Sequence, residues 1–152
     1  MAEKTVAHDH QALVIIVQSA WLRPYANRVA FRCKSELELL GVKILHFEVP
    51  GVLTMAYTIR KLSRKYAACS AFVAISVIQR GETRHADYIV QSSLDALCKV
   101  MMTIDKPIVC EFLVGDSTEQ IEARSGEDEN NRGFHAACDV GMLMQLEKLL
   151  GS

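Results

Sequence analysis

The sequence has few of the features that would place it in a membrane or on a nucleic acid. Its longest apolar runs span residues 12–17 and 71–78, far short of the roughly 20 residues that a membrane-spanning helix needs. The first ten residues are polar and lack the apolar stretch of a secretory signal. The net charge is only −1, so no basic excess favours DNA, RNA or an anionic membrane. We therefore expect a cytoplasmic protein with no membrane or nucleic-acid partner.

Motifs for a metal ion or a nucleotide cofactor are missing as well. The five cysteines form an odd set without Cys-x-x-Cys or Cys/His ligand spacing, so we expect reduced thiols and no disulfide framework or zinc site. No Gly-x-Gly-x-x-Gly motif, Walker loop or Ser–His–Asp set is present. The sequence therefore predicts no metal and no cofactor.

What the sequence does contain is a regular alternation of strand and helix patterns. At 152 residues, with 50% apolar and 23% charged residues, the chain suits one globular domain with a single core. Continuous apolar runs typical of buried strands lie at residues 12–17, 42–49, 70–78 and 108–114. Helical patterns follow them at residues 24–40, 52–66, 87–103, 118–124 and 133–150.

This alternation predicts the fold class. Strands that alternate with helices form a parallel sheet with right-handed crossovers and helices on both faces. We therefore predict an α/β three-layer sandwich of flavodoxin-like type, with a four-stranded, mainly parallel sheet. Residues 12–152 form this domain, and residues 1–11 form either a polar tail or an added edge strand.

Some of the predicted helices have apolar faces of unusual extent. The last helix is expected to carry one apolar stripe, made of Phe134, Cys138, Met142, Leu146 and Leu149. The faces that are too apolar for one small domain to cover lie around Phe31, Leu37, Met142 and Leu146. These faces indicate self-association.

The segment after the third predicted strand is the main candidate for a site. That strand ends near Gly81, and a helical pattern begins a few residues later. A strand, a glycine-containing turn and a helix N-terminus together present free backbone N–H groups to one anion. Glu82 and Thr83 lie on this turn, and His85 adds a group that titrates near neutral pH. The alternative is an ordinary loop in which Gly81 makes the bend and Thr83 caps the helix.

Four other positions along the chain are unusual. Trp21 follows the first strand, where its ring could stack on a planar ligand or fill a subunit interface. The rigid turn Val49-Pro50-Gly51 places the next helix N-terminus beside Trp21. Arg124, just before an acidic loop, is on its own most simply a surface residue at a helix end. Glu111 falls in a strand that should be buried, so it requires a partner or an exposed edge.

Taken in order, these segments resemble the lumazine synthase family over about residues 12–150. The resemblance rests on Arg80-Gly-Glu-Thr-Arg-His85 with Asp87-Tyr88, on Ala123-Arg-Ser-Gly126 and on Asn131-Arg-Gly133. It implies a transferase of riboflavin biosynthesis that needs no cofactor. The implied small-molecule substrates are 5-amino-6-ribitylaminouracil and 3,4-dihydroxy-2-butanone 4-phosphate, which are joined to form 6,7-dimethyl-8-ribityllumazine.

The resemblance also implies that the site lies between neighbouring subunits of a homopentamer. The Gly81-Glu82-Thr83 turn would hold the butanone phosphate together with Arg124 of the adjacent subunit, because a guanidinium fork suits a phosphate. His85 would transfer protons. Contacts with the pyrimidine ring are implied for Trp21, Ile78 and Gln79. Pentamers of this family also pair into decamers or close into sixty-subunit shells.

The implied ribityl pocket departs from the family's usual pattern. Leu53, Thr54 and Ala56 stand where an aromatic residue, a glutamate that holds the ribityl hydroxyls and a proline are usual. Thr54 can still bind a hydroxyl group. Losing a charge-assisted hydrogen bond nevertheless weakens binding by about 10- to 150-fold.

The half of the site implied for the adjacent subunit departs too. Cys110 replaces a phenylalanine that reaches into the pyrimidine pocket, and Glu111 replaces the glycine beside it. Arg132 keeps the charge of the usual lysine, whereas His135 replaces an acidic residue. The sequence therefore predicts a divergent lumazine synthase. It leaves open a slow or non-catalytic relative that binds a lumazine, flavin or phosphate ligand in the same interface pocket.

Overall fold

Four parallel strands form the central sheet. In the computed structural model, which describes residues 11–151, they are β1 (Leu13–Ser19), β2 (Lys43–Val49), β3 (Cys69–Gln79) and β4 (Ile108–Gly115). The order across the sheet is β2-β1-β3-β4, and each neighbouring pair is parallel. β1 and β3 occupy the centre and are buried along nearly their whole length, which explains their continuous apolar sequences.

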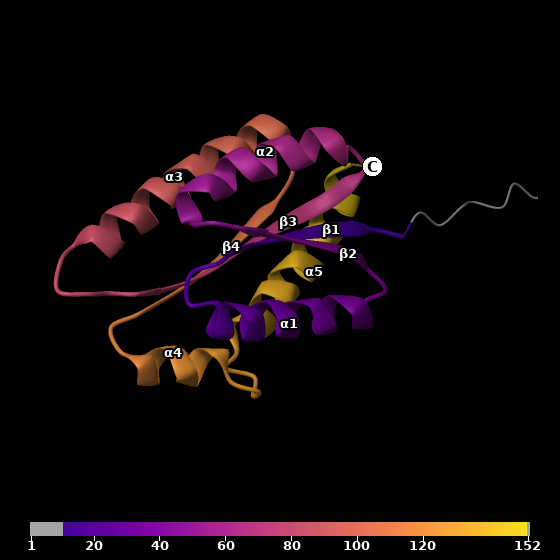
Figure 1. Ribbon diagram of the computed structural model, residues 1–152. Helices are drawn as coiled ribbons and strands as arrows, with labels where there is room; N and C mark the ends of the chain where they lie inside the picture. Colours follow the sequence, from indigo (N-terminus) through magenta and orange to yellow (C-terminus); the bar gives the residue numbers. More distant parts are fainter. Residues whose placement is uncertain (1–10, 152) are drawn as a thin grey trace, which may run out of the picture.

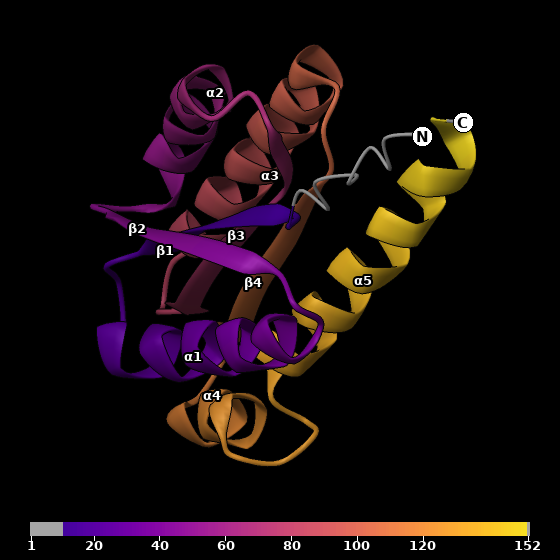
Figure 2. The same ribbon diagram turned by 90° about the vertical axis from the view of Figure 1, so that its right-hand side faces the viewer.

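Helices cover both faces of this sheet (Figure 1, Figure 2). One face carries the short helix η1 (Val52–Thr54), α2 (Met55–Lys65) and α3 (His85–Ile104). The other face carries α1 (Arg23–Leu39), α4 (Thr118–Ser125) and α5 (Arg132–Leu150). Side chains alternate between the two layers, so that Ile15 and Phe72 point to the first and Ile16 and Val73 to the second. The predicted three-layer α/β fold is confirmed.

Each predicted strand and helix of the described residues is present, with ends that shift by a residue or two. The helical pattern at residues 52–66 is divided into η1 and α2. The third predicted helix begins at His85, earlier than expected, so this residue lies in the first turn of α3. The expected tail or edge strand falls on residues 1–10, which lie outside the described part of the chain.

The inward face of α5 differs from the predicted stripe. The buried residues are Gly133, Ala136, Ala137 and Val140, whereas Met142 is 69% exposed and Cys138 and Leu146 are also exposed. Small residues take the inward positions because α5 crosses close to α1. A Cβ atom on Gly133 would lie only 2.0 Å from the carbonyl oxygen of Val29.

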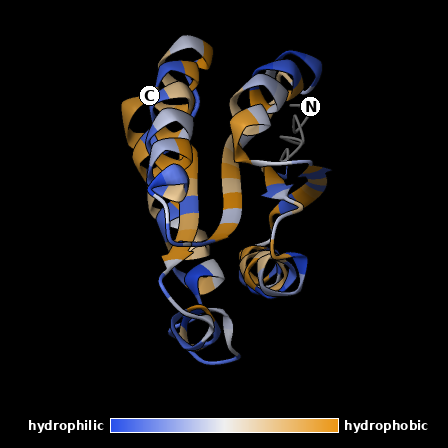
Figure 3. Ribbon diagram, turned by 60° about the vertical axis from the view of Figure 1, so that its left-hand side comes forward, coloured by the Kyte–Doolittle hydropathy of each residue, from blue (hydrophilic) through white to orange (hydrophobic). Residues whose placement is uncertain are grey.

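Large apolar side chains remain exposed on the outer faces of the helices. Figure 3 shows strands that are largely hydrophobic between helices of mixed character. Phe31 is 72% exposed and Leu39 is 81% exposed, as expected for a surface that another molecule covers. Leu37, predicted on such a face, is fully buried in the core, so that part of the prediction is wrong. Within residues 11–151, no helix combines the length and apolar character needed to cross a membrane.

Candidate functional site

The loops that follow the four strands meet at one edge of the sheet. Because the strands are parallel, their carboxyl ends share this edge, which is where ligands bind in such folds. The amide of Ala20 donates a hydrogen bond to the carbonyl of Val49 (2.9 Å), and that of Arg80 donates to the carbonyl of Gly115 (2.9 Å). The loops after β1 and β2 are therefore joined, as are those after β3 and β4.

Trp21 lies beside the turn after β2, as predicted. A Cβ atom on Gly51 would lie 3.5 Å from Nε1 of the indole ring, so the ring packs against the backbone of this turn. The next residue, Leu22, has a left-handed conformation (φ 44°) and packs its side chain against the core. Trp21 itself is 68% exposed, so one face of the ring is available to a ligand or a partner.

Thr54, which stands at the position of the usual ribityl-binding glutamate, is tied to its own turn. Its hydroxyl donates a hydrogen bond to the carbonyl of Gly51 (2.7 Å). A hydroxyl has one proton to donate, so in this arrangement Thr54 can only accept from a ribityl hydroxyl. Leu53 beside it is largely exposed.

The turn between β3 and α3 is braced by Arg80. The guanidinium donates to Asp87 (Nε to Oδ1, 2.7 Å) and to Asp116 (Nη1 to Oδ1, 3.0 Å). Asp87 belongs to the first turn of α3 and Asp116 follows β4, so one side chain links three elements. This role of Arg80 and Asp116 was not evident from the sequence, although an acidic residue in a first helical turn is a known signal.

Residues 81–85 are exposed. No described residue accepts a hydrogen bond from the backbone N–H groups of Gly81, Glu82 or Thr83. The Thr83 hydroxyl accepts a long bond from the amide of His85 (3.4 Å), but the N-cap of α3 is Arg84, without a side-chain capping bond, so Thr83 is not the cap. Ile78 and Gln79, at the end of β3, are half-buried and exposed, respectively.

Gly81 is not required by the packing of this chain. Its φ is not in the left-handed region, and a Cβ atom there would meet nothing within 4 Å. The reading in which Gly81 is needed to make the bend therefore lacks support. Open space above a glycine next to free N–H groups is what close approach of an anion requires.

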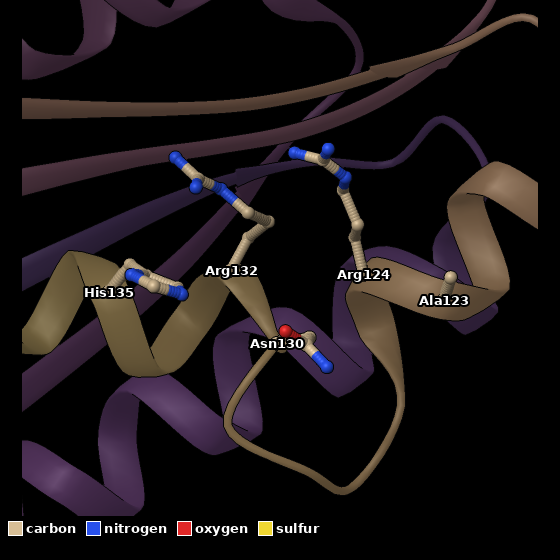
Figure 4. A pocket seen from close by; sticks show the side chains of 5 residues that line it. All are labelled: Ala123, Arg124, Asn130, Arg132 and His135. Atoms are coloured by element: carbon tan, nitrogen blue, oxygen red, sulfur yellow. The ribbon is translucent and has the colours of Figure 1, made fainter.

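A second group of predicted residues lines a hollow between α4 and α5 (Figure 4). The hollow has a volume of about 290 Å³ and is lined by Ala123, Arg124, Asn130, Arg132 and His135. Figure 4 shows the guanidinium groups of Arg124 and Arg132 projecting toward the same side. In residues 11–151, Arg124 makes no ion pair or side-chain hydrogen bond, so its charge is uncompensated.

Arg132 supplies the partner that Glu111 requires. Its guanidinium donates through Nε to Oε1 (2.7 Å) and through Nη2 to Oε2 (3.2 Å). Burial raises the pKa of Glu111 above its ordinary value, and the hydrogen bonds and charge of Arg132 oppose that rise. The prediction that this carboxylate has a partner is confirmed.

Cys110 points to the opposite face of β4 from Glu111. It packs against the core layer beneath α2 and α3, and it pairs with Ala74 in the amino-terminal half of β4, away from the carboxyl edge. Burial, followed by the charges of Cys98 and Glu111, raises the pKa of its thiol to about 11. Cys110 is therefore protonated at neutral pH.

Apart from Cys110, the predicted site residues thus form two separate groups in one copy of the chain. The first lies at the carboxyl edge and on the α3 side, whereas the second lies between α4 and α5 on the other face of the sheet (Figure 1). The hollow of the second group includes none of residues 19–25, 50–54 or 78–85. Among the side chains that the structure describes, no three His, Cys, Asp or Glu residues gather in a way that could hold a metal ion.

The chain is similar to known proteins over most of its length. The model of the 6,7-dimethyl-8-ribityllumazine synthase family matches residues 11–148. A 6,7-dimethyl-8-ribityllumazine synthase of Bdellovibrio bacteriovorus is 31% identical over 123 residues, 80% of this chain and 68% of that protein. One from Burkholderia multivorans is 30% identical over 137 residues, 88% of this chain and 79% of that protein. One from Christiangramia forsetii is 29% identical over 105 residues, 69% of this chain and 62% of that protein.

The match covers every described strand and nearly the whole of α5. It therefore includes both groups of predicted site residues, the exposed turn at residues 81–85 and the residues that line the hollow between α4 and α5. The chain belongs to the 6,7-dimethyl-8-ribityllumazine synthase family.

Proposed function

We propose that this protein is a 6,7-dimethyl-8-ribityllumazine synthase that acts as a homopentamer or a multiple of one. It would condense 5-amino-6-ribitylaminouracil with 3,4-dihydroxy-2-butanone 4-phosphate, releasing phosphate and water. The observation that carries the proposal is that the two groups suited to bind an anion lie on opposite faces of the sheet in one chain. Free N–H groups at residues 81–83 lie on one face of the sheet, and the uncompensated charge of Arg124 lies on the other.

The turn at residues 81–83 suits the phosphate of the butanone substrate. Three unpaired N–H groups beside a helix N-terminus favour a bound anion, since the helix dipole adds a partial positive charge there. Gly81 leaves open space for the anion, and Arg80 holds the turn in place through two carboxylates. This preorganisation lowers the cost of binding.

Arg124 would complete the phosphate site from a neighbouring subunit. Its guanidinium has no partner among residues 11–151, and a phosphate offers the two oxygens that its fork can bind. The exposed apolar side chains Phe31 and Met142 are consistent with surfaces that other copies of the chain cover. A ring of identical head-to-tail contacts would give each site both groups.

His85 would be the proton-transfer residue. It lies in the first turn of α3, directly after the phosphate-binding turn, and is exposed. There it could take a proton from the substrate amine during imine formation and return one to the departing phosphate. Trp21 would stack on the pyrimidine, with one face of its ring exposed.

Incubation of the purified protein with both substrates tests this proposal. We expect lumazine fluorescence to rise in step with released inorganic phosphate, because one phosphate leaves for each ring that closes. Omitting either substrate is the control. Absence of both signals, at protein concentrations where the assembly is intact, would contradict the proposed activity.

A second candidate function is ligand binding without turnover, or with slow turnover. The observation that favours it is the Thr54 hydroxyl, whose proton is committed to the carbonyl of Gly51. The ribityl pocket then lacks a charged acceptor, which weakens substrate binding. In this case Trp21→Ala should abolish the quenching of a bound lumazine's or flavin's own fluorescence, whereas His85→Ala should leave it unchanged.

A further inference from the structure

The ion pair between Glu111 and Arg132 has a consequence for the hollow between α4 and α5. The Glu111 side chain is 4% exposed and that of Arg132 is 35% exposed. The carboxylate therefore lies in the protein interior, while part of the guanidinium reaches the wall of the hollow. Two hydrogen bonds fix the orientation of the arginine, as in other bidentate pairs of this type.

Because of this pair, the two arginines of the hollow differ in how far their charges are compensated. Arg124 carries a charge that no described residue compensates. The charge of Arg132 is offset by a carboxylate at 2.7 Å, and Asp139 lies close enough to act on the same guanidinium. His135, which lines the hollow, also interacts with Glu111. An anion in the hollow thus meets one free cation and one largely neutralised one.

Stability alone does not account for this pair. Taking a carboxylate out of water is costly, and replacing a buried ion pair with apolar residues is often neutral or stabilising. An apolar side chain at position 111 would fit the surroundings, because Leu113 and Val109, which point to the same side of β4, are buried apolar residues in the α5-side core. The packing of the sheet therefore does not require a carboxylate at position 111.

We propose that Glu111 is a positioning residue that holds Arg132 against the wall of the hollow and offsets its charge, so that Arg124 is the only one of the two arginines that offers the phosphate a full positive charge. The inference rests on the proposed function, since it assumes that the hollow receives the phosphate group. Its effect is to limit how tightly the site retains inorganic phosphate after the reaction. Arg132 contributes its remaining N–H groups as donors of fixed direction.

Calorimetric titration with inorganic phosphate tests this role. In Glu111→Gln the side chain keeps its size but loses its charge, and its single amide oxygen can accept from only one of the two Arg132 donors, while its NH2 group faces the other. The guanidinium should then turn toward the hollow and bind phosphate together with Arg124. We expect the dissociation constant to fall by about three- to tenfold at low salt, the usual effect of one added charge at a partly exposed site.

Three further variants identify the origin of that change. Glu111→Gln combined with Arg132→Gln should lose the gain, because the effect acts through Arg132. Glu111→Met should show the same gain as Glu111→Gln, and it serves where the glutamine variant folds poorly. Glu48→Gln is the control, since Glu48 on the edge strand β2 forms a similar two-bond pair with Arg23, the first residue of α1, and it should leave phosphate binding unchanged.

The outcomes separate this inference from the proposed function. Wild-type binding that is lost in Arg124→Ala but is unchanged or weaker in both Glu111 variants would overturn the role of Glu111 alone. A gain that persists in the double variant would show that it does not pass through Arg132. No phosphate binding by the wild type or by any Glu111 variant would contradict the anion site and the inference together.

Discussion

Substitution of Gly133 by alanine tests the close crossing of α5 and α1. The added Cβ atom would lie 2.0 Å from the carbonyl oxygen of Val29, 2.8 Å from the amide nitrogen of Cys33 and 2.9 Å from the carbonyl carbon of Val29. These are backbone atoms of α1, which cannot rotate away as a side chain can. The two helices must therefore separate, and the core between them must open.

The magnitude follows from two opposing effects. Overpacking of a close-packed interior costs about 1–3 kcal/mol. The overpacking cost of Gly133→Ala should be near the upper end, about 3 kcal/mol, because backbone atoms cannot move aside as a side chain can. Alanine gains up to about 1 kcal/mol over glycine through helix propensity. We therefore expect a net loss of about 2 kcal/mol in the free energy of unfolding.

Gly141 in the same helix provides the matched control. A Cβ atom there would lie 3.5 Å from Cδ1 of Leu40, an ordinary contact. Gly141→Ala should be neutral or stabilising by up to about 1 kcal/mol. Both variants should be unfolded in denaturant at the same protein concentration, because self-association makes stability depend on concentration. Equal stability of the two variants would refute the close crossing of α1 and α5.

Four other outcomes are expected. Phosphate should raise the unfolding temperature through preferential binding to the folded state. Arg124→Ala should remove most of that rise, whereas Arg124→Lys should keep part of it. An unchanged rise in the alanine variant would show that this arginine is only a surface residue. His85→Ala should lower the rate of lumazine formation by about 10- to 10⁴-fold while leaving the phosphate shift in place, and a rate equal to that of the wild type would exclude the imidazole from proton transfer. Thr54→Glu should lower the KM for the ribityl substrate by about tenfold or more, because it restores a charged acceptor; a higher KM would show that the pocket has no room for the longer side chain. Burial raises the pKa of the Cys110 thiol to about 11, so its alkylation should be slow at pH 7 and accelerate toward pH 11 as the reactive thiolate forms; mass spectrometry of the alkylated protein measures this, and rapid reaction at pH 7 would contradict the burial of Cys110.

The fold could be predicted closely because its main signals are local. Buried parallel strands such as β1 and β3 leave continuous apolar runs in the sequence, and the helices between them fix the direction of the sheet. The inward face of α5 could not be predicted in the same way. Gly133, Ala136 and Ala137 carry little hydrophobic signal, and they face inward because of how closely α1 approaches.

The candidate site was only partly predictable for a related reason. The exposed turn at residues 81–85 is contiguous, so anion binding there can be proposed from neighbouring residues. The partner of Glu111 cannot, because Arg132 is 21 residues away on another element. The hydrogen bond from Thr54 to Gly51 likewise depends on how the turn after β2 folds. Both side-chain contacts therefore had to come from the structure.

The shared site is the central claim, and the activity of mixed assemblies tests it most directly. His85→Ala and Arg124→Ala chains, refolded together in equal amounts, should form pentamers in which some sites take His85 from one subunit and Arg124 from the next. In a ring of head-to-tail contacts with random mixing, about half of the subunits carry native His85, and about half of their neighbours carry native Arg124. About a quarter of the sites therefore contain both native residues. We therefore predict that lumazine formation recovers to about a quarter of the wild-type rate per subunit. A mixture no more active than the average of the two separate variants would contradict the claim that neighbouring subunits share the site.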